Sequence, residues 1–287
     1  MDFPYSSQVQ EKLEKIKDSP GQVYLFYGSK GLGKLRSATY IACELLGVAN
    51  TNILELAHPN LTYVNLKQGK KLISISQVRD ISERIWKTSV SDKMQKLVIV
   101  DGIDKISLDG ANALLKNLED SPPQTSFFLI ADSIDAVLPT IRSRSQLVYF
   151  SEPQKESVIK FLESNYGLGR EEATNLFNSA HGLPELAVSF LDNNVFDNAV
   201  SLQKNAQDLL SGTVTQGFLV AKEINEQKLG SEFITELLYA TKQQSTILVL
   251  EENINKLEAI LRAQSQISAN VSTRTVIESL ALQIAIK

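Results

Sequence analysis

A glycine-rich segment near the amino terminus has the composition of a phosphate-binding loop. It reads GSKGLGKL and consists of Gly28, Ser29, Lys30, Gly31, Leu32, Gly33, Lys34 and Leu35. This is the G-x-x-x-x-G-K pattern, in which successive backbone N–H groups form a nest for phosphate and the following helix adds its positive end. Lys34 would reach the β- and γ-phosphates of a nucleotide. The sequence therefore predicts a P-loop; the alternative is a glycine-rich turn that only connects a strand to a helix.

The residue after this lysine is unusual for a P-loop that hydrolyses nucleotide. Such loops carry Ser or Thr there, because the hydroxyl is a ligand of Mg²⁺. Here the position holds Leu35, whose side chain cannot bind a metal ion. ATP could still dock on the backbone amides and on Lys34, but the ion would lose one protein ligand. We therefore expect a degenerate P-loop, in which ATP binding is in doubt and no cofactor is required.

A second candidate is an aspartate that follows a short apolar run. Residues 97–100 read LVIV and are followed by Asp101, the arrangement of a Walker B strand whose acid lies near the metal. Active ATPases of this layout place a glutamate next, to polarise the attacking water, but Gly102 stands there. The general base is either missing or displaced to Asp104. The alternative for Asp101 is an ordinary aspartate at a strand end or helix cap.

The elements that must position these residues follow from the hydrophobic pattern of the first 150 residues. The expected strands cover residues 22–27, 61–66, 97–100, 127–131 and 147–150. The expected helices cover residues 37–46, 75–90 and 107–120. This alternation of strand and helix predicts an α/β domain with a parallel sheet and helices on both faces.

The rest of the chain has a helical pattern. No proline follows Pro184, and proline is the residue that most often breaks helices. Residues 154–192 predict two or three short helices, broken at 167–169 and 181–184. The later amphipathic segments predict helices over 198–211, 214–228, 231–250, 252–268 and 272–286. We expect three domains: 1–150, 151–194 and 195–287.

Composition excludes several classes of protein. The 287 residues carry 29 basic and 33 acidic side chains, a net charge of −4, so the chain is not built to hold nucleic acid by itself. The single cysteine, Cys43, excludes an internal disulfide and a thiolate zinc site. No apolar run approaches the roughly 20 residues that span a bilayer, and from the polar amino-terminal residues we expect no signal peptide. We expect a soluble, cytoplasmic protein without a membrane partner.

Two further stretches carry a family resemblance. Residues 101–123 read DGIDKISLDGANALLKNLEDSPP, and residues 138–146 read LPTIRSRSQ. Together with the P-loop, they resemble the clamp-loader branch of the AAA+ ATPases, and within it the delta-prime subunits of bacterial DNA polymerase III. The phrases HPNL at 58–61 and ISQVR at 75–79 are also similar to that family. The resemblance implies an AAA+ P-loop domain, a small helical lid and an all-α collar domain through which subunits assemble.

The resemblance also implies a role for one arginine. Ser143, Arg144 and Ser145 match the family's Ser-Arg-Cys motif, with serine in place of cysteine. In the family this arginine is a finger that reaches the γ-phosphate of ATP held by a neighbouring subunit, and its fixed charge suits that task. The alternative is a surface arginine, with Arg142 equally able to form a salt bridge. Glu119 and Asp120 could form an acid pair, but acids at a helix end before Pro-Pro are more often solvated surface residues.

Four positions depart from active members of the family: Leu35, Gly102, Ala131 and Glu185. Ala131 stands where a polar sensor is usual, and Glu185 where the lid supplies an arginine; a carboxylate there would repel a triphosphate. The cysteines of the family's zinc module are absent. The sequence therefore predicts a non-hydrolysing structural subunit. Its partners would be the ATPase subunits and delta, with the sliding clamp and primed DNA engaged through the assembly.

Two other functions stay open at this point. The glycines, Lys34 and Asp101 also fit an ATP-hydrolysing clamp-loader or motor subunit. A P-loop kinase fits less well, because it needs a lid rich in arginines and residues 154–190 contain only Arg170.

Overall fold

The computed structural model describes residues 3–18, 23–49, 53–54, 58–67, 69–86, 95–192, 196–245 and 250–285. The chain forms two compact units. One comprises Met1–Leu168 with Gly182–Leu186, and the other comprises Gly169–His181 with Ala187–Lys287. The predicted three-domain division stays a prediction.

The first unit contains a parallel sheet. Among the residues described, its strands are β1 (Val23–Tyr27), β2 (Leu61–Val64), β3 (Lys96–Asp101), β4 (Thr125–Ala131) and β5 (Gln146–Tyr149). They lie in the order β2-β3-β4-β1-β5, and each neighbouring pair is parallel. The predicted parallel sheet is therefore confirmed, with strand ends shifted by a few residues from the expected ones.

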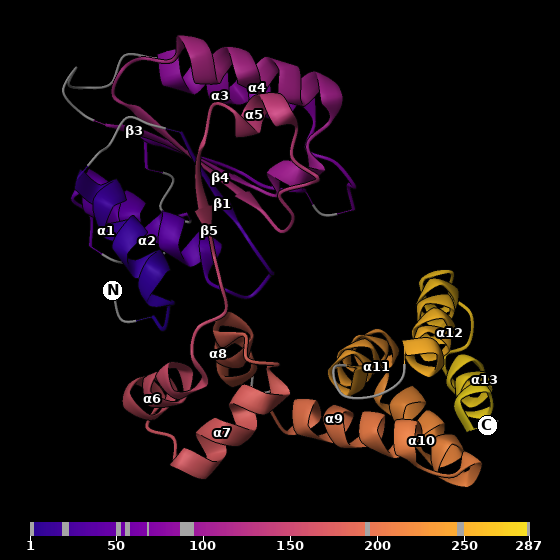
Figure 1. Cartoon of the computed structure of the whole chain (residues 1–287). Coiled ribbons are helices and arrows are strands. Elements are labelled where there is room, and N and C mark those ends of the chain that lie inside the picture. Colours follow the sequence, from indigo (N-terminus) through magenta and orange to yellow (C-terminus); the bar gives the residue numbers. More distant parts are fainter. Residues whose placement is uncertain are drawn as a thin grey trace. The chain divides into compact units, whose positions relative to one another are not determined.

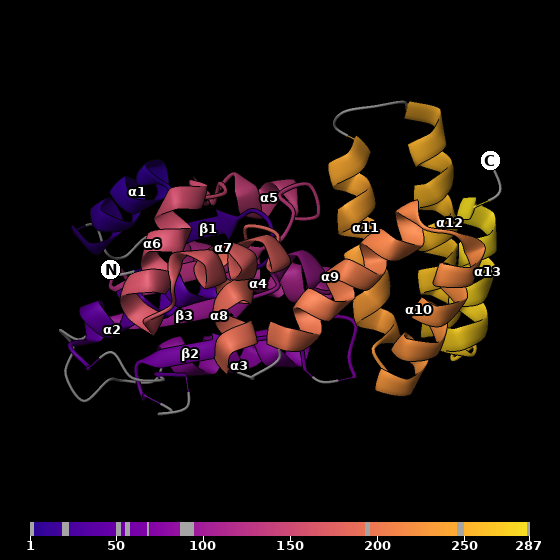
Figure 2. The ribbon, with the colours of Figure 1, turned by 90° about the horizontal axis from the view of Figure 1, so that it is seen from below.

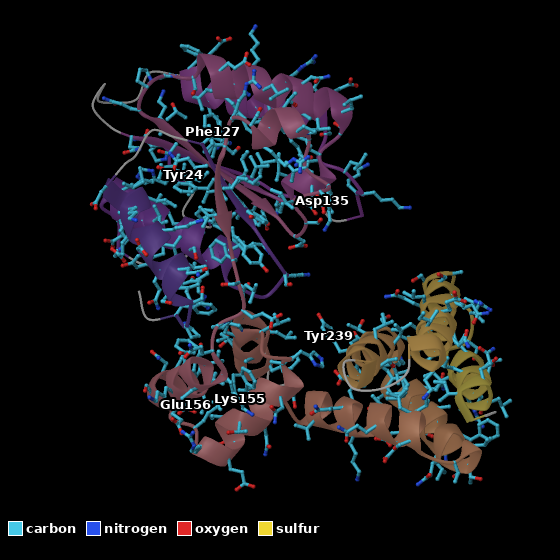
Figure 3. All side chains as sticks on the ribbon, in the orientation of Figure 1. Tyr24, Phe127, Asp135, Lys155, Glu156 and Tyr239 are labelled. Atoms are coloured by element: carbon cyan, nitrogen blue, oxygen red, sulfur yellow. The ribbon has the colours of Figure 1, made fainter. Side chains whose placement is uncertain are left out.

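Helices cover both faces of this sheet (Figure 1). On one face lie α1 (Ser7–Asp18) and α2 (Lys34–Leu46); on the other lie α3 (Ile75–Trp86), α4 (Leu108–Asp120) and the short α5 (Pro139–Arg142). Successive side chains of a strand belong alternately to two apolar clusters, one on each face of the sheet. Tyr24 packs with α1 and α2, and Phe127 packs with α3 and α4 (Figure 3). Because successive side chains of a strand point to opposite faces, the continuous apolar runs of the sequence supply both clusters.

The register brings the carboxyl ends of three strands together. Tyr27 at the end of β1 lies opposite Ala131 at the end of β4, and Asp101 at the end of β3 lies opposite Ile130. The residues that follow these strands therefore share one edge of the sheet, which is where ligands bind in parallel α/β folds.

The predicted short helices after the sheet are confirmed. They are α6 (Lys155–Tyr166), α7 (Arg170–Ser179) and α8 (Pro184–Asp192). Gly167 ends α6 in the left-handed conformation, at φ 69°, which glycine adopts without a steric penalty. Pro184 begins α8, a position where its missing N–H costs no hydrogen bond.

The second unit is helical (Figure 2). Its later helices are α9 (Phe196–Ser211), α10 (Val214–Gln227), α11 (Gly230–Ser245), α12 (Leu250–Ser268) and α13 (Thr273–Ala285). The predicted helices over 75–90 and 231–250 are present as far as Trp86 and Ser245; residues 87–90 and 246–249 of these predictions lie outside the described ones. In the parts of the chain that are described, no helix has the length and apolar character needed to cross a membrane.

Candidate functional site

The predicted P-loop lies between β1 and α2. Its glycines adopt positive φ angles: 141° at Gly28, 89° at Gly31 and 79° at Gly33. Such angles are unfavourable for residues with a Cβ atom, which explains the spacing of the glycines. Leu32 is buried in the core, whereas Ser29 and Lys30 are exposed. The segment therefore lies between a strand and a helix, as the sequence predicts; its role in nucleotide binding stays a prediction.

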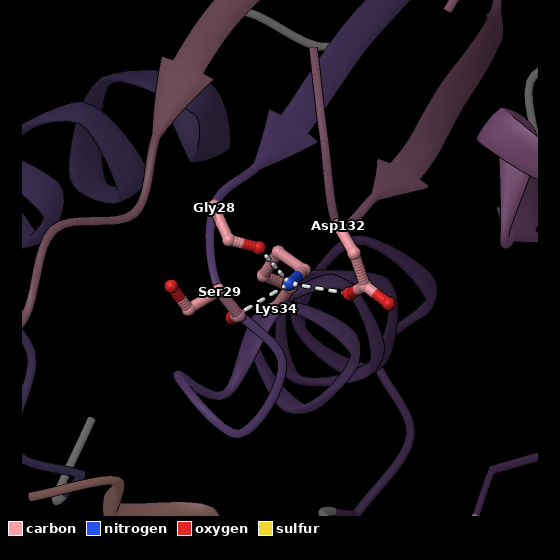
Figure 4. A network of polar contacts seen from close by, with 4 residues as sticks. All are labelled: Gly28, Ser29, Lys34 and Asp132. Carbon is pink, nitrogen blue, oxygen red and sulfur yellow. Dashed lines mark hydrogen bonds and ion pairs between the residues drawn. The ribbon is translucent and has the colours of Figure 1, made fainter. Parts of the chain in front are cut away.

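Lys34 is fully engaged by the chain itself (Figure 4). It is buried, with 4% of its surface exposed. Its ammonium group donates to the carbonyl oxygen of Gly28, to that of Ser29 at 2.8 Å and to Oδ1 of Asp132 at 3.0 Å. A lysine ammonium has three N–H donors, so these three acceptors use all of them.

Side chains from other segments also cover two glycines of the loop. The ring of Phe3 lies so close to Gly33 that a Cβ atom there would meet it at 2.6 Å. The Tyr5 hydroxyl donates to the carbonyl oxygen of Gly33 at 3.3 Å. Leu183 packs on Gly31, whose carbonyl oxygen accepts from the backbone N–H of Glu185 at 3.0 Å.

A pocket of about 380 Å³ opens beside the loop. Its charged lining residues are Lys30, Lys34, Lys105, Asp101, Asp104, Asp132 and Glu185. Three cations thus face four carboxylates, a net charge of 3 − 4 = −1, which repels a further anion. The structure therefore brings together the predicted P-loop and the predicted Walker B-like Asp101, but with more negative than positive charge around them.

Three of the four departures from active ATPases line this pocket: Leu35, Gly102 and Glu185. The fourth, Ala131, is buried at the end of β4 and directly precedes Asp132. Leu35 offers no ligand to Mg²⁺, and the amino group of Lys34 has no free donor for phosphate. The residues present therefore do not fit a magnesium–nucleotide complex. Among the described residues, no group of three or more His, Cys, Asp or Glu side chains could hold a metal ion.

Asp101 lies in a setting that disfavours its charge. Burial raises the pKa of its carboxyl group, and the nearby charge of Asp132 adds to this effect. The hydroxyl of Tyr63 donates to its Oδ2 at 3.4 Å, and burial raises the pKa of Tyr63 to about 12. Asp104, the alternative base, lies in a short 3-10 helix, and its Oδ1 is buried without a hydrogen-bond partner.

Replacement of Asp101 by asparagine is expected to reduce the loss of stability with rising pH. A raised folded-state pKa means that the folded chain holds this proton more tightly than the unfolded chain. Stability therefore falls as the pH rises from the unfolded value, 3.8, through the folded pKa. Asparagine cannot ionise, so the free energy of unfolding of the variant, relative to the wild type, should be higher at about pH 7 than at about pH 3.5 in urea titrations. An equal difference at both pH values would contradict this assignment.

Arg144 lies outside the pocket. Ser143, Arg144 and Ser145 follow α5 and lead into β5, and the two serine hydroxyls donate to backbone carbonyl oxygens of the α5 turn. Arg144 donates through Nη1 to the carbonyl oxygen of Thr140 at 3.1 Å and pairs through Nη2 with Oε1 of Glu119 at 2.5 Å. Its side chain is 41% exposed.

Sequence reasoning missed two partners of the predicted residues. Glu119, expected to be a solvated helix end, pairs with Arg144, and Asp132 pairs with Lys34. Arg142 makes a longer contact with Asp135, at 3.9 Å. Asp132 and Lys34 are separated by 98 positions, so a local pattern could not reveal their contact; the only signal was a carboxylate directly after an apolar strand.

Comparison with known proteins gives the family. A family model described as "DNA polymerase III, delta subunit" matches residues 5–154, which is more than half of the chain. The delta-prime subunit of DNA polymerase III from Haemophilus influenzae is 35% identical over 47% of this chain, a match that spans 41% of that protein. The delta-prime subunit from Bacillus subtilis is 25% identical over 97% of both chains.

A solved structure agrees in fold. A DNA polymerase III gamma-subunit-related protein from Thermotoga maritima superposes with a TM-score of 0.63 at 18% identity, over 97% of this chain and 99% of that one. At this identity the likeness concerns the fold alone. The family model and the delta-prime relatives lead to one conclusion: the chain belongs to the DNA polymerase III delta subunit family, in the clamp-loader branch of the AAA+ proteins.

Proposed function

We propose that this chain is a non-hydrolysing, delta-prime-like subunit of a clamp loader that places the sliding clamp on primed DNA in the cytoplasm. Its partners would be the ATPase subunits and delta. One observation carries the proposal: the three N–H donors of Lys34 are all taken by Gly28, Ser29 and Asp132. Leu35, in the place of the Mg²⁺ ligand, supports it further.

The exposure of Arg144 supports its proposed contact with ATP on a neighbouring subunit. Its side chain is exposed, and it does not line the pocket of its own chain. Its partner Glu119 is 49% exposed, and an ion pair between two exposed side chains contributes little to stability. A phosphate group on another subunit could therefore replace Glu119 at small cost, and the guanidinium would bind it through two parallel hydrogen bonds.

Apolar side chains beside this arginine support an interface. β5 pairs only with β1 among the described strands, which makes it an edge strand, and it exposes Leu147 and Tyr149 to 43% and 54%. The rings of Tyr149 and Tyr27 lie 5.3 Å apart. Exposed aromatic and aliphatic side chains next to a charged anchor are typical of protein–protein contacts.

Replacement of Leu147 and Tyr149 together by serine is expected to weaken binding to the neighbouring ATPase subunit roughly tenfold or more. The matched control is Leu72→Ser, because Leu72 is 53% exposed and precedes α3 on another part of the unit. Binding can be measured by surface plasmon resonance with the purified subunits. Equal affinities for the double variant and the control would contradict an interface at β5.

The direct test of the proposed function is ATP turnover by the isolated chain, followed by turnover in the reconstituted assembly with clamp and primed DNA. We expect the chain alone to be inactive and Lys34→Ala to leave turnover by the assembly unchanged. Turnover by the isolated chain that Lys34→Ala abolishes would support the alternative, an ATP-hydrolysing subunit.

A further inference from the structure

We propose that Asp132 takes the place of a nucleotide phosphate on the P-loop lysine, so that the chain excludes nucleotide by an anion of its own. This inference deepens the proposed function and rests on it. It assigns the exclusion of ATP to one carboxylate, rather than to the lost Mg²⁺ ligand at Leu35 alone.

The backbone fixes the place of this carboxylate. Tyr27 and Ala131 lie opposite each other at the ends of β1 and β4, so Gly28 and Asp132 are the residues that leave the sheet side by side. Gly28 begins the P-loop, and Asp132 begins the turn after β4. The Asp132 side chain therefore enters the phosphate loop from the neighbouring strand (Figure 4).

The burial of Lys34 gives the contact its strength. The side chain of Lys34 is 5% exposed and that of Asp132 is 44% exposed. A buried ammonium group is unfavourable unless it is hydrogen-bonded and paired with opposite charge. In the described part of the chain, Asp132 is the carboxylate in ion-pair contact with Lys34, and the two loop carbonyls complete its shell. A phosphate would have to displace this complete set of acceptors.

The charged side chains that line the pocket together also disfavour the binding of a nucleotide phosphate. Asp132 is one of four carboxylates that line the pocket, against three lysines. Removal of its charge, as in Asp132→Asn, changes the net charge of the lining from −1 to 0. Removal of the whole side chain, as in Asp132→Ala, also frees one N–H of Lys34. Both changes favour an anion, whereas Leu35 affects only the metal ion. Binding of ATP in the absence of Mg²⁺ therefore separates the effect of Asp132 from that of Leu35.

The test uses the full chain and ATP in the presence of EDTA at low salt, with binding followed by isothermal titration calorimetry. The variants are Asp132→Asn, which keeps the shape of the side chain, and Asp132→Ala, which removes it. The matched control is Asp135→Ala, because Asp135 is 92% exposed and does not line the pocket. The double variant Asp132→Asn with Lys34→Ala tests whether any gain in affinity for ATP depends on Lys34.

We expect both Asp132 variants to bind ATP at least tenfold more tightly than the wild type, the Asp135→Ala control to match the wild type, and the double variant to lose the gain. Circular dichroism checks that each variant is folded, and Asp132→Asn decides the outcome if Asp132→Ala unfolds. The inference would be overturned if folded Asp132→Asn bound ATP no more tightly than the wild type, or if the double variant kept the gain in affinity. Either result would leave the proposed function intact. Wild-type chain that binds and hydrolyses ATP would instead overturn the proposed function.

Discussion

Replacement of Arg144 by alanine is expected to slow ATP hydrolysis about 10³-fold at the one site of the assembled clamp loader that faces this chain. The guanidinium would stabilise the charge that develops on the γ-phosphate, and alanine leaves that charge without a partner. Arg144→Lys should recover part of the rate, because an ammonium keeps the charge but cannot form two parallel hydrogen bonds. Single-turnover hydrolysis, with the other ATPase sites inactivated, measures this step directly.

The neighbouring residues provide the controls for this experiment. Arg142→Ala removes a cation two positions before Arg144. Arg142 makes a long contact of 3.9 Å with Asp135. The Arg142→Ala variant should leave the rate of ATP hydrolysis unchanged. Glu119→Ala releases Arg144 from its pair and should maintain or raise the rate. If Arg142→Ala slowed hydrolysis as much as Arg144→Ala, the effect would come from the charge of the surface and not from a positioned finger.

Replacement of Gly28 by alanine is expected to lower the free energy of unfolding by about 3 kcal/mol or more. Gly28 has a φ of 141°, and a Cβ atom there would lie 2.4 Å from the backbone carbonyl oxygen of Phe150. A backbone atom of a neighbouring segment cannot move aside as a flexible side chain can. The variant should therefore shift both the P-loop and the end of β5, and guanidinium unfolding measures the loss.

Gly47 offers the matched comparison. It also has a positive φ, 65°, but no atom lies within 4 Å of the position that a Cβ would take. Gly47→Ala should therefore cost only the conformational penalty of about 1 kcal/mol. Similar losses for the two variants would show that the contact with Phe150 adds nothing, and that the loop is more adaptable than its geometry implies.

The fold was largely predictable because its signals are local. Alternation of apolar runs with helical spacing predicts the strands and most helices of the first unit, and proline and glycine mark the breaks between α6, α7 and α8. The exceptions are the short α5, which was not predicted, and α1, whose residues were treated only as a polar amino terminus. The buried residues of α1, Val9, Leu13 and Ile16, have helical spacing, but they are few among charged neighbours, so the pattern is weak over a short segment.

The candidate site was predictable only in part. The P-loop is a contiguous pattern, and its residues were found from the sequence. The partners of its lysine and of Arg144 come from other elements, so only tertiary structure brings them into contact. Asp132 and Glu119 are ordinary carboxylates in sequence, and their importance follows from which strand or helix end lies next to which loop.

The short segment Gly182–Leu186 packs with the first unit, although the residues on both sides of it belong to the second. The first unit therefore cannot complete its contacts until this segment has been synthesised. All five described strands have been synthesised by residue 149, but Leu183, which covers Gly31, has not. On the ribosome, the sheet can form while Gly31 of the phosphate loop still lacks its contacts with Leu183 and Glu185, and these contacts form only after α8 emerges. A truncated protein that ends at residue 154, where the family match ends, would remain in that earlier state.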